Sequence, residues 1–275
     1  MKKRFVFIIS FILVVGFSTQ ALAQFTPEEL AEREKWEKLL KDAKVVGQTQ
    51  LGGKEAVTEP WVLELEADGE KFRAIWKNPL GRVKGFLESW KWEIAAYRLD
   101  KFLGLNMVPV TVEKRFQEEL GCCQLWIEDT FTLKDKEEKK LKTPSIKVYY
   151  WNRALFIQRA WDNLIYNEDR HQNQFLITQD WRMLLIDHSR SFATSKKSTK
   201  RLIYDEKFAE GPRLMKQLPR TLYENIKALT AAQIKAVVGD YLTDAEIEAV
   251  LVRRELIVAW VEKRIKELGE DKVLY

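Results

Sequence analysis

The chain has 275 residues, with 46 Lys and Arg against 41 Asp and Glu, which gives a net charge of +5 at pH 7. Hydrophobic residues make up 46% of the sequence, enough for a sizeable core, and this excludes disordered and collagen-like classes. The two cysteines are the adjacent Cys122 and Cys123, so a framework of several disulfides is excluded as well.

The first 23 residues have the pattern of a secretory signal peptide. Three basic residues (2–4) precede a mostly apolar run (5–15), and Ala21-Leu22-Ala23 forms a small-x-small cleavage site. The apolar run is shorter than the roughly 20 residues that a membrane-spanning helix needs. We therefore expect cleavage after Ala23, export to the periplasm or the medium, and no remaining membrane span. Without this leader, 43 basic and 41 acidic residues leave a net charge of +2, which argues against a nucleic-acid partner.

The front of the exported chain is predicted to be rich in strands. Thr26-Pro27-Glu28-Glu29 is a capping box with proline at the first helical position, so a helix is expected from there to about Lys41. Asp68-Gly69 is typical of a hairpin turn. Hydrophobic patterning predicts strands over 45–53, 61–66, 71–77, 108–114 and 122–128, a loop over 78–85, and a helix over 88–103.

The back of the chain is predicted to be mostly helical. The Lys-rich segment 134–142 is expected to be a linker or an exposed loop, and apolar spacing predicts a helix over 149–167. A hairpin is expected from strands at 175–177 and 183–186, and Thr243-Asp244-Ala245-Glu246 caps a long final helix. These patterns predict an α+β, two-lobed protein, with an N-terminal helix (24–44), a β-rich lobe (45–130) and a helical lobe (131–275).

Four charged residues suit phosphoryl transfer when they are taken together. That reaction needs a fixed cation for the nucleotide phosphates and a carboxylate to hold that cation, which Lys77 and Glu93 can supply. It also needs a carboxylate facing the acceptor hydroxyl and oxygen ligands for a metal ion, which suits Asp169 and Asp187. Taken singly, each of the four is an ordinary surface charge.

The order of these segments resembles a known kinase superfamily. Asp169-Arg170-His171, followed by a hairpin and Ile186-Asp187-His188, is similar to the catalytic core of phosphatidylinositol 3- and 4-kinase-type enzymes. HipA-like kinases share that core and, more remotely, so do secreted four-jointed-type kinases. The segment 93–99, followed by Leu103-Gly104-Leu105, resembles the bacterial branch. The resemblance covers about residues 45–260 and implies a protein-kinase-like fold that uses ATP with Mg²⁺ or Mn²⁺.

The resemblance also implies a role for each site residue. Lys77 would contact the nucleotide phosphates and pair with Glu93, and Asp169 would be the catalytic carboxylate, with Arg170 and His171 supporting its loop. Asp187 would be the metal ligand. The family usually has Asn where Gln174 stands, so Gln174 and its neighbour Asn173 are both candidate metal ligands. The remaining implied nucleotide contacts are Gly52 and Gly53 in a phosphate loop, and Glu128 at the end of the strand that leads into the hinge.

The sequence leaves three functions open. The first is an exported kinase whose acceptor is a Ser or Thr hydroxyl of an exported protein, or a hydroxyl of a sugar or glycan. The second is a catalytically inactive kinase-like binding protein, because Gln at position 174 loosens the metal site. The third is a scaffold of the cell envelope. His171 and His188 are expected to serve in the loop and in packing, not as a metal-binding pair.

Overall fold

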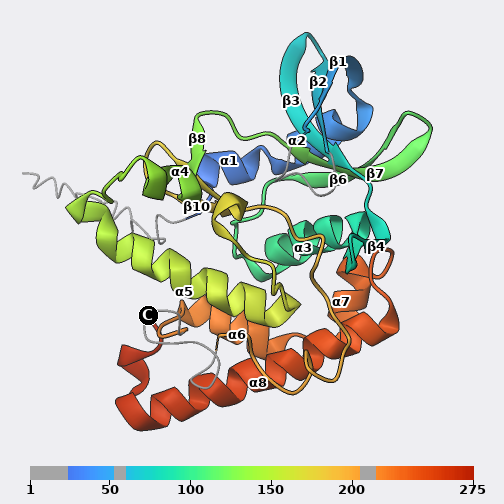
Figure 1. Cartoon of the computed structure of the whole chain (residues 1–275). Helices are drawn as coiled ribbons and strands as arrows, with labels where there is room; N and C mark the ends of the chain where they lie inside the picture. Colours follow the sequence, from blue (N-terminus) through green and yellow to red (C-terminus); the bar gives the residue numbers. More distant parts are fainter. Residues whose placement is uncertain (1–23, 53–59, 205–214) are drawn as a thin grey trace, which may run out of the picture.

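The computed structural model describes residues 24–52, 60–204 and 215–275. The predicted signal peptide (1–23) and Gly53 lie outside these ranges. The strands of the main sheet gather at one end of the molecule, and the long helices α5 (Val148–Ile165) and α8 (Asp244–Leu268) lie at the other (Figure 1). This is the predicted α+β arrangement, with a β-rich front and a helical back.

An antiparallel sheet of five strands, in the order β1-β2-β3-β7-β6, forms the front of the chain. The five strands are β1 (Lys44–Gln50), β2 (Trp61–Ala67), β3 (Glu70–Lys77), β6 (Thr111–Phe116) and β7 (Glu119–Leu125). The front of the chain also contains the helices α1 (Pro27–Ala31), α2 (Arg33–Asp42) and α3 (Trp90–Leu103), and a separate pair of strands, β4 (Leu80–Val83) and β5 (Phe86–Ser89). The helix α3 contacts β6 and β7 on the sheet and also α6 and α7 of the helical half. It therefore lies between the two halves of the molecule (Figure 1).

The back of the chain contains a small sheet, in the order β10-β9-β8, and most of the helices. Its further elements are β8 (Thr130–Thr132), α4 (Leu133–Glu138), η1 (Ser145–Lys147), η2 (Gln172–Gln174), β9 (Phe175–Thr178), β10 (Met183–Leu185), α6 (Arg220–Ala228), α7 (Ala231–Val238) and η4 (Glu270–Lys272). The predicted capping box at Thr243 is present at the start of α8. Among the described residues, no helix is long and apolar enough to cross a membrane.

The predicted N-terminal helix is two helices in the structure. The capping box is present, because Thr26 N donates to Glu29 Oε2 over 2.6 Å and Glu29 N donates to Thr26 Oγ1 over 3.3 Å. The helix ends at Ala31, and α2 begins at Arg33, with Glu32 as the cap residue between them. The first residue of α2, Arg33, is buried and forms an ion pair of 3.3 Å with the fully buried Asp100 of α3. This pair fixes α2 against α3.

Two segments predicted as loops have regular structure. Residues 78–85 contain β4, which pairs with β5 through a turn at Lys84-Gly85. Both turn residues have positive φ, 47° and 91°, the geometry that matches the twist of a two-residue hairpin. The sequence pattern does not reveal this hairpin, because Gly81 and Gly85 are equally typical of a loop. The Lys-rich segment contains α4, which begins with a capping box between Thr132 and Asp135.

One hydrophobic core runs through both halves. Leu63 and Ala74 of the sheet, Trp161 of α5 and Ile257 of α8 belong to a single connected cluster of buried side chains. Trp161 is fully buried and is among the largest side chains in this cluster. Continuous packing of this kind resists small displacements, so the residues between the halves are held in place from both sides.

The two cysteines of β7 offer a simple test of this packing. Both are free and buried: Cys122 packs with Trp90 and Ile94, and Cys123 lies in the main core. Burial raises the pKa of the Cys123 thiol to about 12 and raises that of Cys122 as well. Because the thiolate is the reactive form, we expect neither thiol of the native protein to react with DTNB at pH 8 within minutes. In guanidinium chloride both should react, and Cys122→Ser should leave one; rapid labelling of the native protein would contradict this packing.

Candidate active site

The centre of the site is a lysine held between two carboxylates. Lys77 is the last residue of β3, Glu93 lies in the first turn of α3, and Asp187 follows β10. Lys77 Nζ lies 2.5 Å from Glu93 Oε1 and 2.6 Å from Asp187 Oδ1. The Lys77 side chain is 11% exposed and that of Glu93 is 1% exposed, so these charges are shielded from water by the protein.

The charges of this cluster stabilise one another. Burial opposes the charge on Lys77, but the nearby Asp187 and Glu93 outweigh it and raise the lysine pKa above its usual range. The protein surroundings also oppose charge on the two carboxylates. Lys77 outweighs that effect in both cases and, with further help from His188, lowers the pKa of Glu93 and of Asp187. All three groups are therefore charged at neutral pH.

The backbone at Asp187 is held in an uncommon conformation. Its φ is +60°, in the left-handed region that non-glycine residues seldom adopt. Hydrogen bonds fix the chain on both sides of it: Arg170 Nη1 donates to Ile186 O over 2.6 Å, and His188 N donates to Glu93 Oε2 over 2.9 Å. The strained position is therefore over-determined by its neighbours, which is a common property of functional sites.

Arg170 lies beneath the site and supports it. Its side chain is 1% exposed and binds the fully buried carboxylate of Asp162 with two hydrogen bonds of 3.0 Å. It also donates to Gln174 O over 3.2 Å and lies 3.0 Å from His188 Nε2. His188 Nε2 is in addition 3.3 Å from Trp161 Nε1, and burial lowers the pKa of His188, so its ring is neutral at pH 7. Arg170 thus ties the loop after α5 to the residues around Asp187.

Asp169 faces the same cleft and is bound by an arginine. Arg190 Nη1 lies 3.1 Å from Asp169 Oδ2, while Arg190 Nε and Nη2 donate to Glu88 Oε1 over 2.9 and 2.7 Å. Glu88 is 1% exposed, and its other oxygen accepts from Ser189 Oγ over 3.2 Å. Glu88 is not predicted from the sequence. An acidic residue just before a helix is ordinarily explained by the helix dipole, and no motif distinguishes this one.

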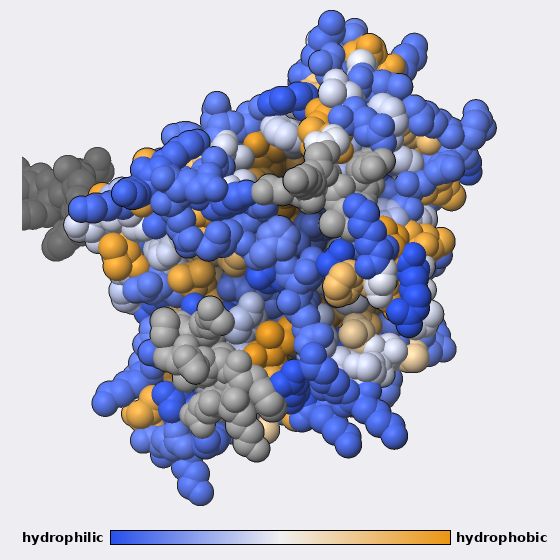
Figure 2. Space-filling model, in the orientation of Figure 1, coloured by the Kyte–Doolittle hydropathy of each residue, from blue (hydrophilic) through white to orange (hydrophobic). Residues whose placement is uncertain are grey.

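A cleft of about 510 Å³ contains these polar groups and has apolar walls. The walls come from the main sheet on one side and from the β9–β10 region on the other, with Ile75, Leu125, Leu176 and Ile186. Of the residues predicted for the site, those that line the cleft are Lys77, Asp169, His171, Asn173, Gln174 and Asp187. Hydrophilic residues cover most of the face of the molecule that Figure 2 shows, with smaller hydrophobic patches between them.

The remaining predicted residues, apart from Arg170 beneath the site, either do not line the cleft or fall outside the described ranges. Gly52 is described but does not line the cleft, and Gly53 is not described. Glu128 is exposed and pairs with Arg73, whose Nε donates to it over 2.8 Å. Glu93 lies behind Lys77 and reaches the cleft only through that lysine.

The oxygen donors in the cleft suit a hard divalent cation. Ser189 Oγ lies 3.3 Å from Asp187 Oδ1 and 3.2 Å from Glu88 Oε2, so two carboxylates approach one region. Gln174 turns its Nε2 toward Asp187 Oδ2, at 3.0 Å, and its oxygen accepts from His171 N. Two carboxylates near one position are the donor number that Mg²⁺ usually takes from a protein, with substrate phosphates and water completing its shell.

Solved structures share this fold. Hydra Fam20, solved with sugar, has a TM-score of 0.66 and 17% identity over 92% of this chain and 95% of its own. The Golgi casein kinase has a TM-score of 0.62 and 13% identity over 92% of this chain and 79% of its own. No protein-family model matches the chain, and neither does any curated protein sequence. The chain therefore has a two-lobed, kinase-like fold, as the sequence predicted.

The buried pair beneath the site predicts a large effect on stability. Arg170→Met leaves the Asp162 carboxylate buried without its cation, which should lower the free energy of unfolding by about 3–5 kcal/mol. Urea unfolding followed by circular dichroism measures it. The matched control is Arg73→Met, whose exposed pair with Glu128 should contribute about 1 kcal/mol or less. Equal losses in the two variants would contradict a structural role for Arg170.

Proposed function

We propose that the protein is an exported, ATP- and Mg²⁺- or Mn²⁺-dependent phosphotransferase whose acceptor is a hydroxyl of a protein Ser or Thr, or of a sugar. The observation that carries the proposal is the Lys77–Glu93–Asp187 cluster at a cleft that also contains Asp169. A fixed cation, a metal-binding carboxylate and a carboxylate for the acceptor are the parts that phosphoryl transfer requires.

The nucleotide would lie in the cleft with its phosphates at Lys77 and its base between the apolar walls. Lys77 would hold the phosphates, because Glu93 fixes its ammonium group at the cleft wall. The adenine ring would lie between apolar side chains of the sheet, such as Ile75 and Leu125, and those of Leu176 and Ile186 across from them. Asp187 and Glu88 would hold the metal, with an amide oxygen of Gln174 or Asn173. That metal would neutralise charge on the phosphates.

Asp169 would orient the acceptor hydroxyl. Arg190 binds its Oδ2, so that oxygen is fixed, and the other carboxylate oxygen is available to accept the proton of an incoming hydroxyl. The side chain is 37% exposed and lines the cleft, so an acceptor can reach it. Arg170 and His171 would take no proton themselves. Arg170 would contribute by holding the loop that carries Asp169 in position.

Two observations support the acceptor class and the location. The leader at 1–23 favours export, where proteins and glycans are available as acceptors. The solved structures with the same fold include one named a Golgi casein kinase and one of Fam20 with sugar. A protein hydroxyl and a sugar hydroxyl are chemically alike, so the same carboxylate serves either acceptor.

A kinase-like binding protein without transfer activity is the second candidate. Arg190 occupies one oxygen of Asp169 and also binds Glu88, and Gln174 presents its amide nitrogen, not its oxygen, to Asp187. A protein that keeps these contacts in the presence of nucleotide would bind it and transfer nothing. The same contacts in an active enzyme must rearrange when the metal and ATP bind.

Nucleotide binding is tested by thermal unfolding with ATP and Mg²⁺ or Mn²⁺. At a nucleotide concentration about 100 times the Kd, ligand binding adds about 2.7 kcal/mol of stability, which should raise the Tm by about 5 °C or more. Asp187→Asn should remove the metal-dependent part of this rise. The control Asp129→Asn makes the same change at an exposed position outside the cleft and should keep it. If ATP with Mg²⁺ or Mn²⁺ does not raise the Tm of the wild type, nucleotide binding is excluded.

Transfer is tested with ATP labelled in its γ-phosphate, using slow transfer to water as an acceptor-independent reading. Asp169→Asn should lower the rate by about 10²-fold or more, the usual contribution of a general base, while the nucleotide-induced rise in Tm is kept. If the wild type binds ATP but releases no labelled phosphate, and phosphorylates neither casein nor a glycan, the binding-protein alternative holds.

A further inference from the structure

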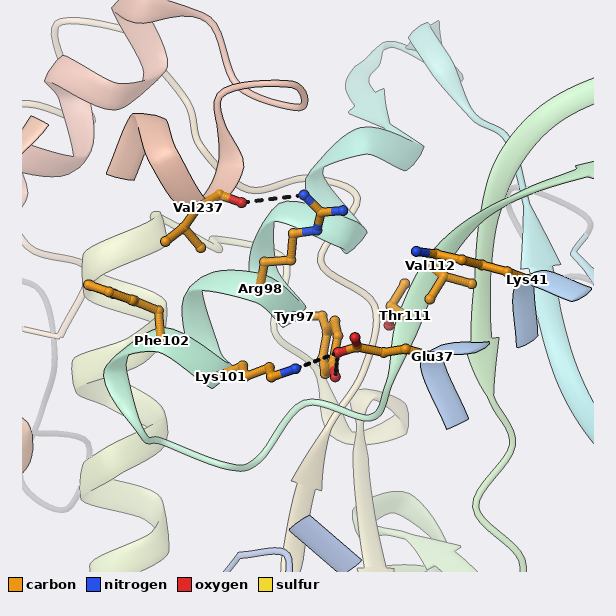
Figure 3. Close-up of a pocket in the computed structure, with 9 residues that line it drawn as sticks. All are labelled: Glu37, Lys41, Tyr97, Arg98, Lys101, Phe102, Thr111, Val112 and Val237. Atoms are coloured by element: carbon orange, nitrogen blue, oxygen red, sulfur yellow. Dashed lines mark hydrogen bonds and ion pairs between the residues drawn. The ribbon is translucent and has the colours of Figure 1, made fainter. Parts of the chain in front are cut away.

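A second pocket, of about 410 Å³, lies where the N-terminal helices, the sheet and the helical half meet. Its walls come from α2, α3, β6 and α7, and Figure 3 shows their side chains around it. None of its lining residues lines the cleft described above. The helix α3 is shared, because it carries Glu93 of the site and, one to two and a half turns later, residues of this pocket.

The pocket is positively charged. Three cationic side chains line it, those of Lys41, Arg98 and Lys101, against the single carboxylate of Glu37. That carboxylate is already occupied: its Oε1 accepts from Tyr97 Oη over 2.6 Å and from Lys101 Nζ over 2.8 Å (Figure 3). The lining side chains therefore carry a net charge of +2, and a ligand with two negative charges would balance it.

Arg98 is positioned to bind such a ligand. Its guanidinium lies over the Tyr241 ring, 4.7 Å from the centroid, and Nη1 makes one long hydrogen bond of 3.4 Å to Val237 O (Figure 3). Within the described chain, its Nε and Nη2 have no protein acceptor. Next to it, Phe102 is 43% exposed and lines the pocket with Val237, which provides an apolar surface. A planar donor group beside an apolar surface suits an oxyanion attached to a ring or a carbon chain.

We propose that this pocket binds a small phosphomonoester, whose doubly charged oxyanion contacts Arg98 and Lys41 while its organic part lies against Phe102. The geometry also connects the pocket to the cleft. Thr111 lines the pocket, and its hydroxyl accepts a buried hydrogen bond of 2.9 Å from the side chain of Gln124, which lines the cleft. These two residues are direct partners in the β6–β7 register, so one hydrogen-bonded pair forms part of both walls.

The connection predicts reciprocal coupling between the two ligands. Occupancy of the pocket would fix α3 and the Thr111–Gln124 pair, and both also support the cleft. By linkage, any factor by which a phosphomonoester changes nucleotide affinity must equal the factor by which the nucleotide changes phosphomonoester affinity. This coupling rests on the proposed nucleotide site, whereas phosphomonoester binding does not.

The test is calorimetric titration of the full chain with phenyl phosphate, with benzoate as a singly charged comparison. It is performed in the Asp187→Asn variant as well as the wild type, because loss of that carboxylate would strengthen a phosphate bound beside Lys77 in the cleft and would leave the second pocket unchanged. We expect saturable 1:1 binding of equal affinity in both. Arg98→Gln should weaken it at least tenfold and Lys41→Gln at least fivefold. The matched control is Lys35→Gln, on α2 but outside the pocket, and it should leave the affinity unchanged.

Each result decides the proposal. Absence of binding, equal affinity of Lys41→Gln and wild type, a changed affinity in Asp187→Asn, or equal affinity for benzoate would overturn the phosphomonoester site. Thr111→Val should keep phenyl phosphate binding and reduce its effect on ATP affinity, and an unchanged effect would overturn the connection. If ATP does not bind at all while phenyl phosphate does, the proposed function and the coupling fail and the pocket stands.

Discussion

The structure depends on Lys77, a largely buried lysine whose ammonium group is paired with the carboxylates of Glu93 and Asp187. Burying an ammonium group costs several kcal/mol unless opposite charges approach it closely. Lys77 meets this condition only because β3, α3 and the segment after β10 converge on it. If both carboxylates moved away, the buried ammonium group of Lys77 would be left unpaired. The cluster therefore links the sheet, the central helix and the β9–β10 region in one arrangement, in addition to any chemistry it performs.

The surrounding packing makes that convergence possible. The helix α3 lies between sheet and helical half, and the buried Arg33–Asp100 pair holds α2 against it. On the other side, Arg170 binds Asp162 and the carbonyl of Ile186, which places the next residue, Asp187, opposite Lys77. The site is thus positioned by buried polar contacts, while the hydrophobic core supplies the rigid frame. Such contacts tolerate little displacement, because a partly satisfied buried network costs more than an apolar one.

Local signals in the sequence predicted much of the fold. The capping boxes at Thr26 and Thr243 correctly predict where two helices begin. They can be recognised in the sequence because capping involves only residues within one helical turn. The hairpin β4–β5 was missed, because a glycine in a turn and a glycine in a loop look alike in one sequence. The candidate charges Lys77, Glu93 and Asp187 do meet in space. Glu88 and Arg190 were not found, since their pairing across 102 positions leaves no local pattern.

The left-handed backbone at Asp187 restricts what can replace it. At this position the side chain and the main chain are both constrained: the carboxylate pairs with Lys77, and φ of +60° favours Asn, Asp or Gly. Asn keeps the backbone and removes the charge, whereas a β-branched residue changes both at once and disturbs the neighbouring contacts to Arg170 and Glu93. Variation at Asp187 in related chains should therefore be limited to very few residue types, whether or not the site is active. Asn or Gly would satisfy the backbone conformation alone. If related chains keep Asp at this position, the carboxylate charge is therefore required as well as the conformation.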